Sequence, residues 1–537
     1  MVDTEAKLPV AQLEPAPRSP RRPRIPALDW GILLVALLSL VALGPLFYPG
    51  FFYSHRGLFA AYEVVGLASA PSLTWLPTLA ADPTLAQGPL PYWLARLLLL
   101  GGIAPTGTIK IVFGASILAA TLGTYVLARR LTAQATVPPG PVSWPGLVAA
   151  TTLAGMPFLA GMVYARGNLA EACALGLVPW ALWASLAATG GRAEEPEPAL
   201  LLVLASAALW TAIGLAHLGL QLAGLVLLLA LRPRREGWAG PLGGLVLAGA
   251  AWAAIAARQP LLLSRSSSAA LDLQQVFSPV VSDTLLPQEG LTLSLGPLAA
   301  LAALLTLAPL GVRRPLRLVG AAALLIGLAL AVALPLWERL PAVFSQPYQL
   351  LGVAGLALAL ALARLVQEAE LARPAAATAI AALALIAGYP AFTFQPVQVR
   401  EPTRFAPAFV DQEIVLLETE LRVAAARPGG IITIVLVWQG RAPIGRDLTV
   451  FTHLQDRAHR VVAQHDGPPV DGRRPTSGWR PGEVLVDFRQ IRIPDDARPG
   501  LYQVVAGMYL PATGDRVGIR TGARTSDALL LGEFEVR

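Results

Sequence analysis

The chain has 537 residues, of which 55% are hydrophobic and only 14% are charged. This composition excludes an ordinary soluble protein of this size and predicts a polytopic membrane protein. The net charge of +7 comes from arginines clustered between apolar segments, a pattern typical of cytoplasmic loops, so we expect no nucleic-acid partner.

The chain begins with residues 1–28, which are rich in proline and charge and are predicted to form a disordered, basic cytoplasmic tail. Trp30–Tyr48 follows as the first spanning helix, and its length argues against a cleavable signal peptide. A long external loop is predicted over 49–105, with an amphipathic interfacial helix near 56–70. Cys173 is the only cysteine, which excludes an intrachain disulfide, and its apolar surroundings predict core packing.

Further apolar segments are close to the ~20 residues that a helix needs to cross a bilayer. They lie at Thr108–Leu127, Pro145–Val163, Leu169–Ala188, Ala199–Leu215, Leu218–Leu231, Trp238–Ala256, Leu293–Leu310, Arg317–Leu334, Leu350–Arg364 and Ala375–Tyr389. The short segment Leu90–Ala104, which carries Arg96, is harder to assign.

Arginine clusters decide the topology, because short cytoplasmic loops are enriched in basic residues. The clusters at 129–130, 232–235, 313–317 and 364–373 agree with the basic N-terminus only if Leu90–Ala104 makes no net crossing. We therefore predict about eleven spans within residues 29–391, with Leu90–Ala104 interfacial or re-entrant. The N-terminus would be cytoplasmic and the C-terminus extracytoplasmic, in a plasma membrane.

The composition changes after Pro390, where residues 392–410 are predicted to be a linker and residues 411–537 a β-sandwich. Short runs rich in β-forming residues alternate with Gly, Pro and Asp turns. The predicted strands are Ile431–Trp438, Leu448–Leu454, Arg460–Gln464, Val484–Ile493, Leu501–Leu510 and Ala528–Val536. The predicted fold class is thus an all-α polytopic membrane domain followed by an all-β sandwich.

Polar residues are predicted to gather on the external side of this topology. The Tyr164–Glu171 turn places Arg166 and Glu171 between two apolar segments, where ionisable residues usually face a cavity, a partner or a pathway. The pair could orient Arg166 toward an anionic head group, or it could be an internal structural pair. His217 could be a ligand or a structural histidine, and the His55–Arg56 pair could bind phosphate or snorkel to the interface. Glu63 could share a face with His55 or lie on a solvated helix face.

The order of several motifs resembles a known group of membrane proteins. A first external loop with His55 and Trp75 precedes Pro89-Leu-Pro-Tyr-Trp93, then Arg129-Arg130, Arg166–Glu171, His217 and Gln346-Pro347. This order resembles bacterial polytopic proteins of the GT-C glycosyltransferase type, the closest group being the "6-pyruvoyl-tetrahydropterin synthase-related" membrane-domain family. Val450–Leu454, Ala463–Asp466, Pro475–Trp479 and Pro499–Tyr502 are similar to a β-sandwich appended to some of these enzymes. In that sandwich, Trp438, Trp479 and Tyr502 are predicted to be core residues, and His465 and Asp466 turn residues rather than a metal site.

The resemblance implies transfer of a hexosyl or pentosyl group from a polyprenyl-phosphate donor at the external membrane face, for the assembly of envelope glycans or glycolipids. It implies Glu63 as base, with Glu171 and His55 beside it as catalytic residues. Arg56, Arg166 and His217 would bind the donor phosphate, and Asn168, Gln346 and Gln349 would line the cavity. No metal ligands are assigned, although this chemistry leaves room for a divalent metal.

One departure from the family pattern matters. Resembling proteins carry an acid shortly before the first-loop histidine, whereas Phe51–Ser54 precede His55 here. Two alternatives to an enzyme therefore stay open: a non-catalytic scaffold that binds envelope glycans, and a transporter of a lipid-linked glycan. A transporter would need polar residues across the whole bilayer, whereas the predicted polar residues concentrate on one side. In each case the expected partners are a lipid-linked glycan and membrane lipids.

Overall fold

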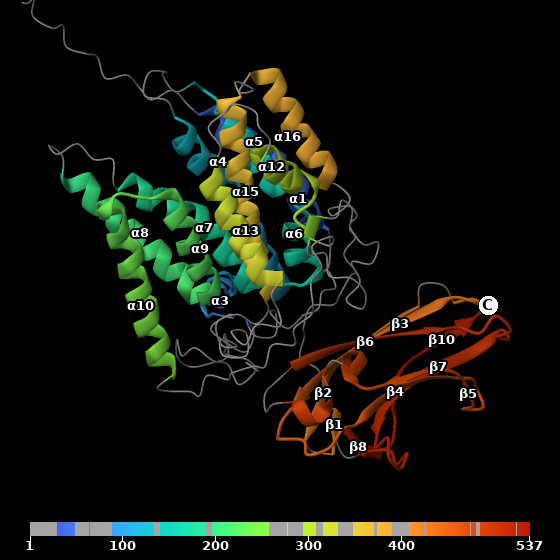
Figure 1. Ribbon diagram of the computed structural model, residues 1–537. Helices are drawn as coiled ribbons and strands as arrows, with labels where there is room; N and C mark the ends of the chain where they lie inside the picture. Colours follow the sequence, from blue (N-terminus) through green and yellow to red (C-terminus); the bar gives the residue numbers. More distant parts are fainter. Residues whose placement is uncertain are drawn as a thin grey trace, which may run out of the picture.

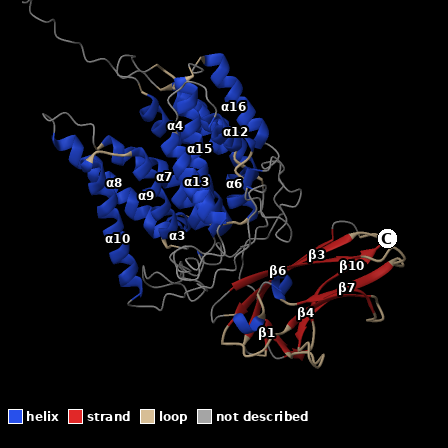
Figure 2. Cartoon of the chain, viewed as in Figure 1, coloured by secondary structure: helices blue, strands red, loops and turns tan. Residues whose placement is uncertain are grey.

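A computed structural model shows a bundle of apolar helices followed by a β domain (Figures 1 and 2). It describes residues 29–48, 64, 88–133, 140–188, 196–256, 276–277, 294–307, 315–330, 347–369, 373–388, 408–411, 413–423, 426–472, 474–479, 484–521 and 524–537. The predicted N-terminal tail, the predicted interfacial helix apart from Val64, and most of the predicted linker lie outside these residues.

Every predicted spanning segment contains a helix. The helices are α1 (Trp30–Leu43) continued by η1 (Gly44–Phe47), α3 (Leu90–Leu100), α4 (Pro105–Thr132), α5 (Trp144–Ala154), α6 (Pro157–Ala160), η2 (Gly161–Ala165), α7 (Leu169–Ala187), α8 (Pro196–Ala216), α9 (Leu218–Leu231), η3 (Arg235–Trp238), α10 (Ala239–Ala256), α12 (Pro297–Leu307), α13 (Leu316–Leu330), η4 (Pro347–Gln349), α15 (Leu350–Glu368) and α16 (Pro374–Gly388).

Five of the described helices are long and apolar enough to cross a membrane, or six spans if the bent α5–α6 pair is counted as one. Other apolar helices, among them α3, α9 and α13, are shorter. The outer surface of the bundle exposes large apolar side chains such as Leu37, Leu201 and Val246, as expected for helices that face lipid. These features support a membrane protein, and the eleven spans stay a prediction.

Polar contacts at the two ends of α1 and α4 show that these helices are antiparallel. Asp29 caps the start of α1 by accepting a hydrogen bond from Gly31 N. It also accepts a hydrogen bond from Tyr125 Oη at 2.8 Å and forms an ion pair with Arg129, both near the end of α4. At the opposite ends, Lys110 Nζ donates to Tyr48 O at 2.7 Å. The end of α1 and the start of α4 therefore lie at the same end of the bundle. This arrangement agrees with the prediction that Leu90–Ala104 makes no net crossing.

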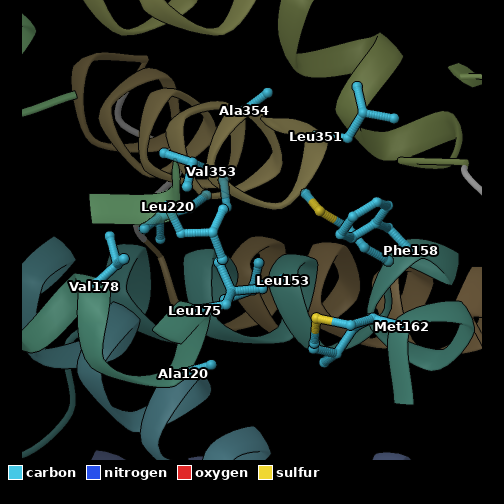
Figure 3. Close-up of a cluster of buried hydrophobic side chains, with 14 of the residues drawn as sticks. Ala120, Leu153, Phe158, Met162, Leu175, Val178, Leu220, Leu351, Val353 and Ala354 are labelled. Atoms are coloured by element: carbon cyan, nitrogen blue, oxygen red, sulfur yellow. The ribbon is translucent and has the colours of Figure 1, made fainter. Parts of the chain in front are cut away.

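The core of the bundle surrounds α7 and α15 (Figure 3). All residues from Leu350 to Ala363 are buried, so neighbouring helices cover every face of this part of α15. This burial explains why the helix is apolar on every face. Phe158, Leu175 and Leu351 pack in this cluster together with residues of α4, α5 and α9. Cys173 belongs to it too, as its apolar surroundings predicted.

Close helix packing at Gly155 makes a testable prediction about this bundle. A Cβ atom at Gly155 would lie 2.2 Å from the carbonyl oxygen of Ala384 on α16, whereas one at Gly249 on α10 would meet nothing within 4 Å. We expect Gly155→Ala to destabilise the bundle by about 1–3 kcal/mol through overpacking. Gly249→Ala is the matched control and should be neutral or stabilising, because alanine favours helix. Thermal unfolding of the purified proteins in detergent checks both, and equal midpoints would contradict the packing.

The β domain consists of two antiparallel sheets around a shared core. Its strands are β1 (Ala408–Val410), β2 (Ile414–Val423), β3 (Ile431–Gly440), β4 (Thr449–Gln455), β5 (Val461–Gly467), β6 (Val484–Arg492), β7 (Gly500–Tyr509), β8 (Ile519–Thr521), β9 (Arg524–Ser526) and β10 (Leu529–Val536). One sheet has the order β6-β3-β2-β1-β8-β9 and the other β10-β7-β4-β5. The six strands predicted from the sequence are confirmed, while β1, β2, β8 and β9 were not predicted.

The core of the sandwich contains Trp438, Trp479 and Tyr502, as predicted. Two predictions here were wrong in detail. The first described strand begins at Ala408, inside the predicted linker. His465 and Asp466 lie in strand β5 rather than in a turn, because β4 pairs with this segment and places Asp466 opposite Phe451. Asp466 is also within 3.3 Å of His453 Nε2, on the neighbouring strand.

Candidate functional site: a buried arginine between two aromatic rings

The structure describes five of the predicted site residues, namely Arg166, Asn168, Glu171, His217 and Gln349. The other four, His55, Arg56, Glu63 and Gln346, lie outside the described residues. The geometry of the site therefore comes from the segment between α6 and α7, from the α8–α9 junction and from the segment that enters α15.

Irregular backbone between α6 and α7 positions Arg166. The α5–α6 pair bends by 50° at the break before Pro157, and α6 continues into η2, a single π-helical turn. Arg166 N donates to Gly161 O at 2.8 Å, and Asn168 N donates to Met162 O at 3.1 Å, which closes the turn. Gly167 has φ +62°, a conformation that favours glycine. Such π-turns are frequent at functional sites, where they displace one side chain from the regular helical repeat.

Arg166 forms a buried ion pair with Glu171. Arg166 Nη2 lies 2.9 Å from Glu171 Oε1, and the two residues are only 4% and 1% exposed. Asn168 Nδ2 donates to Glu171 Oε2 at 3.0 Å, while Asn168 Oδ1 accepts from Glu171 N at 3.2 Å and so caps α7. A carboxylate in the first turn of a helix is also favoured by the helix dipole. Both oxygens of Glu171 are thus engaged in holding Arg166 and the start of α7.

Two aromatic rings enclose the guanidinium group. The Cζ atom of Arg166 lies 4.6 Å from the ring centre of Phe158 on α6 and 4.8 Å from that of Tyr348 on η4. Tyr348 adjoins the buried Gln349, so the segment that enters α15 meets the α6–α7 turn, and the lining of a cavity by Gln349 stays a prediction. Cation–π contacts of this kind hold a guanidinium plane in place. Phe158 and Tyr348 were missed in the sequence, where a lone aromatic residue in an apolar run carries no special signal.

Part of the guanidinium group meets no hydrogen-bond acceptor in the described part of the chain. Arg166 Nε and Nη1 are buried and have no partner among the residues that the structure describes. A buried donor without an acceptor costs about 1–3 kcal/mol, and more when it is charged. Phosphate and carboxylate groups match the fork of donors on a guanidinium group. The chemistry that this arrangement offers is therefore binding of an anion.

His217 has a structural role in the fold. It is the N-cap of α9, where its Nδ1 accepts a hydrogen bond from Leu220 N at 3.2 Å, and it is fully buried. Next to it, Ala216 O accepts from Gly88 N at 2.8 Å, which fastens the residue before Pro89 to the end of α8. Of the two roles that the sequence allowed for His217, the structural one is therefore observed. Its contact with a phosphate stays a prediction. The described residues contain no group of three or more His, Cys, Asp or Glu side chains that could hold a metal ion.

Comparisons with known proteins leave the family open. No protein-family description matches the chain, and no curated protein matches it. Among solved structures, it is similar to the arabinofuranosyltransferase AftD from Mycobacteria, with 20% sequence identity and a TM-score of 0.44. The match covers 67% of this chain and 26% of that chain, so about two thirds of this protein corresponds to about a quarter of the mycobacterial one. At this level the likeness assigns neither an activity nor a family, and the family predicted from the sequence stays a prediction.

Proposed function

We propose that the protein is a GT-C-like membrane glycosyltransferase and that Arg166 binds the phosphate group of a polyprenyl-phosphate-linked sugar. The observation that carries the proposal is Arg166, which is 4% exposed and whose guanidinium group keeps two donors without an acceptor among the described residues. A sugar leaves such a donor by breaking its bond to phosphate, and negative charge grows on the departing phosphate. A preorganised arginine stabilises this charge more in the transition state than in the bound donor.

In this proposal Glu171 positions Arg166 and does not act as a base. Its two oxygens already accept from Arg166 and Asn168, so a proton from an acceptor hydroxyl would have to displace one of these bonds. The base would then be Glu63 in the first external loop, with His55 and Arg56 beside it, as the resemblance implies. The reaction would take place at the external face, where the β domain would also lie.

A scaffold that binds an anionic lipid-linked glycan without turning it over is the second candidate. One observation favours it: the carboxylate that faces the anion site, Glu171, is engaged in an ion pair, and the described residues present no cluster of acidic side chains there. The two candidates share the anion site and differ only in turnover.

Donor consumption by the purified full-length protein separates the two candidates. The protein would be incubated with polyprenyl-phosphate-linked pentoses or hexoses and with an envelope glycan or glycolipid fraction that offers acceptor hydroxyl groups. Transfer of the sugar to an acceptor hydroxyl and release of free polyprenyl phosphate would be followed together by mass spectrometry. The enzyme proposal expects both products with at least one donor. Binding of the phosphate-linked donors without release would support the scaffold. Equal binding of lipids with and without phosphate would contradict both.

A further inference from the structure

The anion site at Arg166 is closed in this structure. The Nε and Nη1 atoms of Arg166 have almost no exposed surface, although both are donors without an acceptor among the described residues. A phosphate oxygen must come within about 2.7–2.9 Å of a donor nitrogen to accept its hydrogen bond. The function proposed above, on which this inference rests, therefore requires that one wall of the site moves aside to admit the ligand.

Three of the side chains around Arg166 are fixed in the interior of the bundle. Glu171 and Asn168 are buried and hydrogen-bond to each other, and Glu171 also holds Arg166. Phe158 is buried as well, and a Cβ atom at Gly352 on α15 would lie only 3.1 Å from its Cε1 atom. Displacing any of these three side chains would break buried hydrogen bonds or open a cavity in the core.

Tyr348 differs from these three side chains because it is only half-buried. It lies on the three-residue turn η4 and packs against the outside of the bundle core. A side chain that reaches the surface can rotate about its χ1 torsion without leaving a cavity in the core. Its ring centre is 4.8 Å from Cζ of Arg166, and this cation–π contact is weaker than the charge-assisted hydrogen bonds that a phosphate group would form.

We propose that Tyr348 is the gate of the anion site: its ring covers Arg166 while the site is empty and turns aside to admit a phosphate group. The ligand stabilises the open state because it binds that state alone. The closed ring meanwhile gives the buried guanidinium group a favourable contact. The gate lowers the rate of ligand association by the fraction of molecules that are open at any moment.

Association kinetics test the gate. Farnesyl phosphate, which carries a phosphate group on a short isoprenoid chain, would be passed over immobilised full-length protein in detergent. Its binding would be followed by surface plasmon resonance, with farnesol as the blank. We expect Tyr348→Leu to associate faster than the wild type by roughly 2- to 30-fold, the range over which one cation–π contact can hold a site closed. Tyr348→Phe keeps a ring over Arg166 and should stay close to the wild-type rate.

Phe158→Leu is the matched comparison, because Phe158 supplies the other ring at nearly the same distance from Cζ of Arg166, 4.6 Å. Its ring belongs to the core, so Phe158→Leu should lower the midpoint of thermal unfolding and should not speed association.

The outcomes distinguish the gate from the site itself. Faster association in both leucine variants, or in neither, would overturn the gate, and so would a Tyr348→Phe variant as fast as Tyr348→Leu. Loss of binding in Arg166→Met, with these rates as expected, would support both inferences. Binding of farnesyl phosphate to Arg166→Met as tight as to the wild type would overturn the anion site, and the gate with it.

Discussion

Replacing Arg489 by methionine is expected to lower the free energy of unfolding of the β domain by about 3–5 kcal/mol. Arg489 and Asp487 are 1% and 0% exposed, and Arg489 Nη2 lies 3.0 Å from Asp487 Oδ2. Without the arginine, a buried carboxylate would lose its cationic partner. Removing one partner of a buried pair is costly because the other charge stays in a medium that solvates it poorly.

Arg489 also connects the two sheets. It lies on β6 of the larger sheet, while its Nη1 donates to Val450 O on β4 and His465 O on β5 of the smaller sheet, at 3.2 and 3.3 Å. Its Nη2 donates to Gly467 O at 3.0 Å and to Pro468 O at 3.1 Å, at the end of β5. Loss of the side chain would therefore remove the hydrogen bonds by which β6 holds carbonyl groups of β4 and β5 in the interior of the sandwich.

Hydrogen exchange of the full-length protein in increasing urea, followed on peptides of β4 and β6, measures this effect separately from the helical bundle. The matched control is Arg492→Met, which removes an exposed arginine on the same strand. Its pair with Asp495 is 67% and 76% exposed, and such pairs contribute only about 0–1 kcal/mol. We expect the double variant Asp487→Asn/Arg489→Met to lose less than the sum of its single variants. Additive losses, or equal losses for the two arginines, would contradict the role given to Arg489.

The second large effect is expected at the anion site, where Arg166→Met should weaken binding of a polyprenyl-phosphate ligand about 100-fold or more. Hydrogen bonds to a charged group are each worth about 1.5–3 kcal/mol, and Arg166 has two buried donors to offer. Arg166→Lys should give an intermediate loss, since it keeps the charge but not the fork of donors. Isothermal titration of the detergent-solubilised protein with polyprenyl phosphate measures these changes.

Glu171→Gln separates positioning from proton transfer. It removes the carboxylate charge beside Arg166, so phosphate binding should be kept or strengthened while the stability of the bundle falls by about 3–5 kcal/mol. A base at this position would instead show unchanged stability with loss of turnover alone.

Arg130→Met is the control for Arg166→Met. Arg130 donates to Leu186 O near the end of α7, at the opposite end of that helix from Glu171. Phosphate binding that is equally weak in Arg130→Met and Arg166→Met would contradict a specific site.

The alternation of side chains explains why some strands were missed. Strand β2 (Ile414–Val423) has charged residues at alternate positions, Glu418, Glu420 and Arg422, and this period of two indicates a strand with one face in solvent. Strands β1, β8 and β9 have three residues each, which is too short for any periodic pattern. They form because each pairs its backbone groups with a strand already in the sheet: β1 pairs with the longer β2, β8 with β1, and β9 with β8.

What the sequence determined by itself is the location of the apolar helices and of the sandwich core. Long apolar runs must become helices in a bilayer because their backbone groups have no water to bind, and large aromatic residues such as Trp438, Trp479 and Tyr502 must be buried where strands alternate. It also identified Arg166 and Glu171 as a pair, because two charges between apolar segments are costly without each other. These results depend on local composition, which the sequence displays directly.

Only the tertiary structure decided what surrounds that pair. Phe158 is a few residues away from Arg166, but Tyr348 is far away in the sequence, and both reach the guanidinium group because α6 and η4 lie against the turn that carries it. Among the described residues, the same packing leaves Nε and Nη1 of Arg166 without an acceptor and engages both oxygens of Glu171. Contacts between distant segments depend on the shape of the whole bundle, which no local pattern of residues encodes.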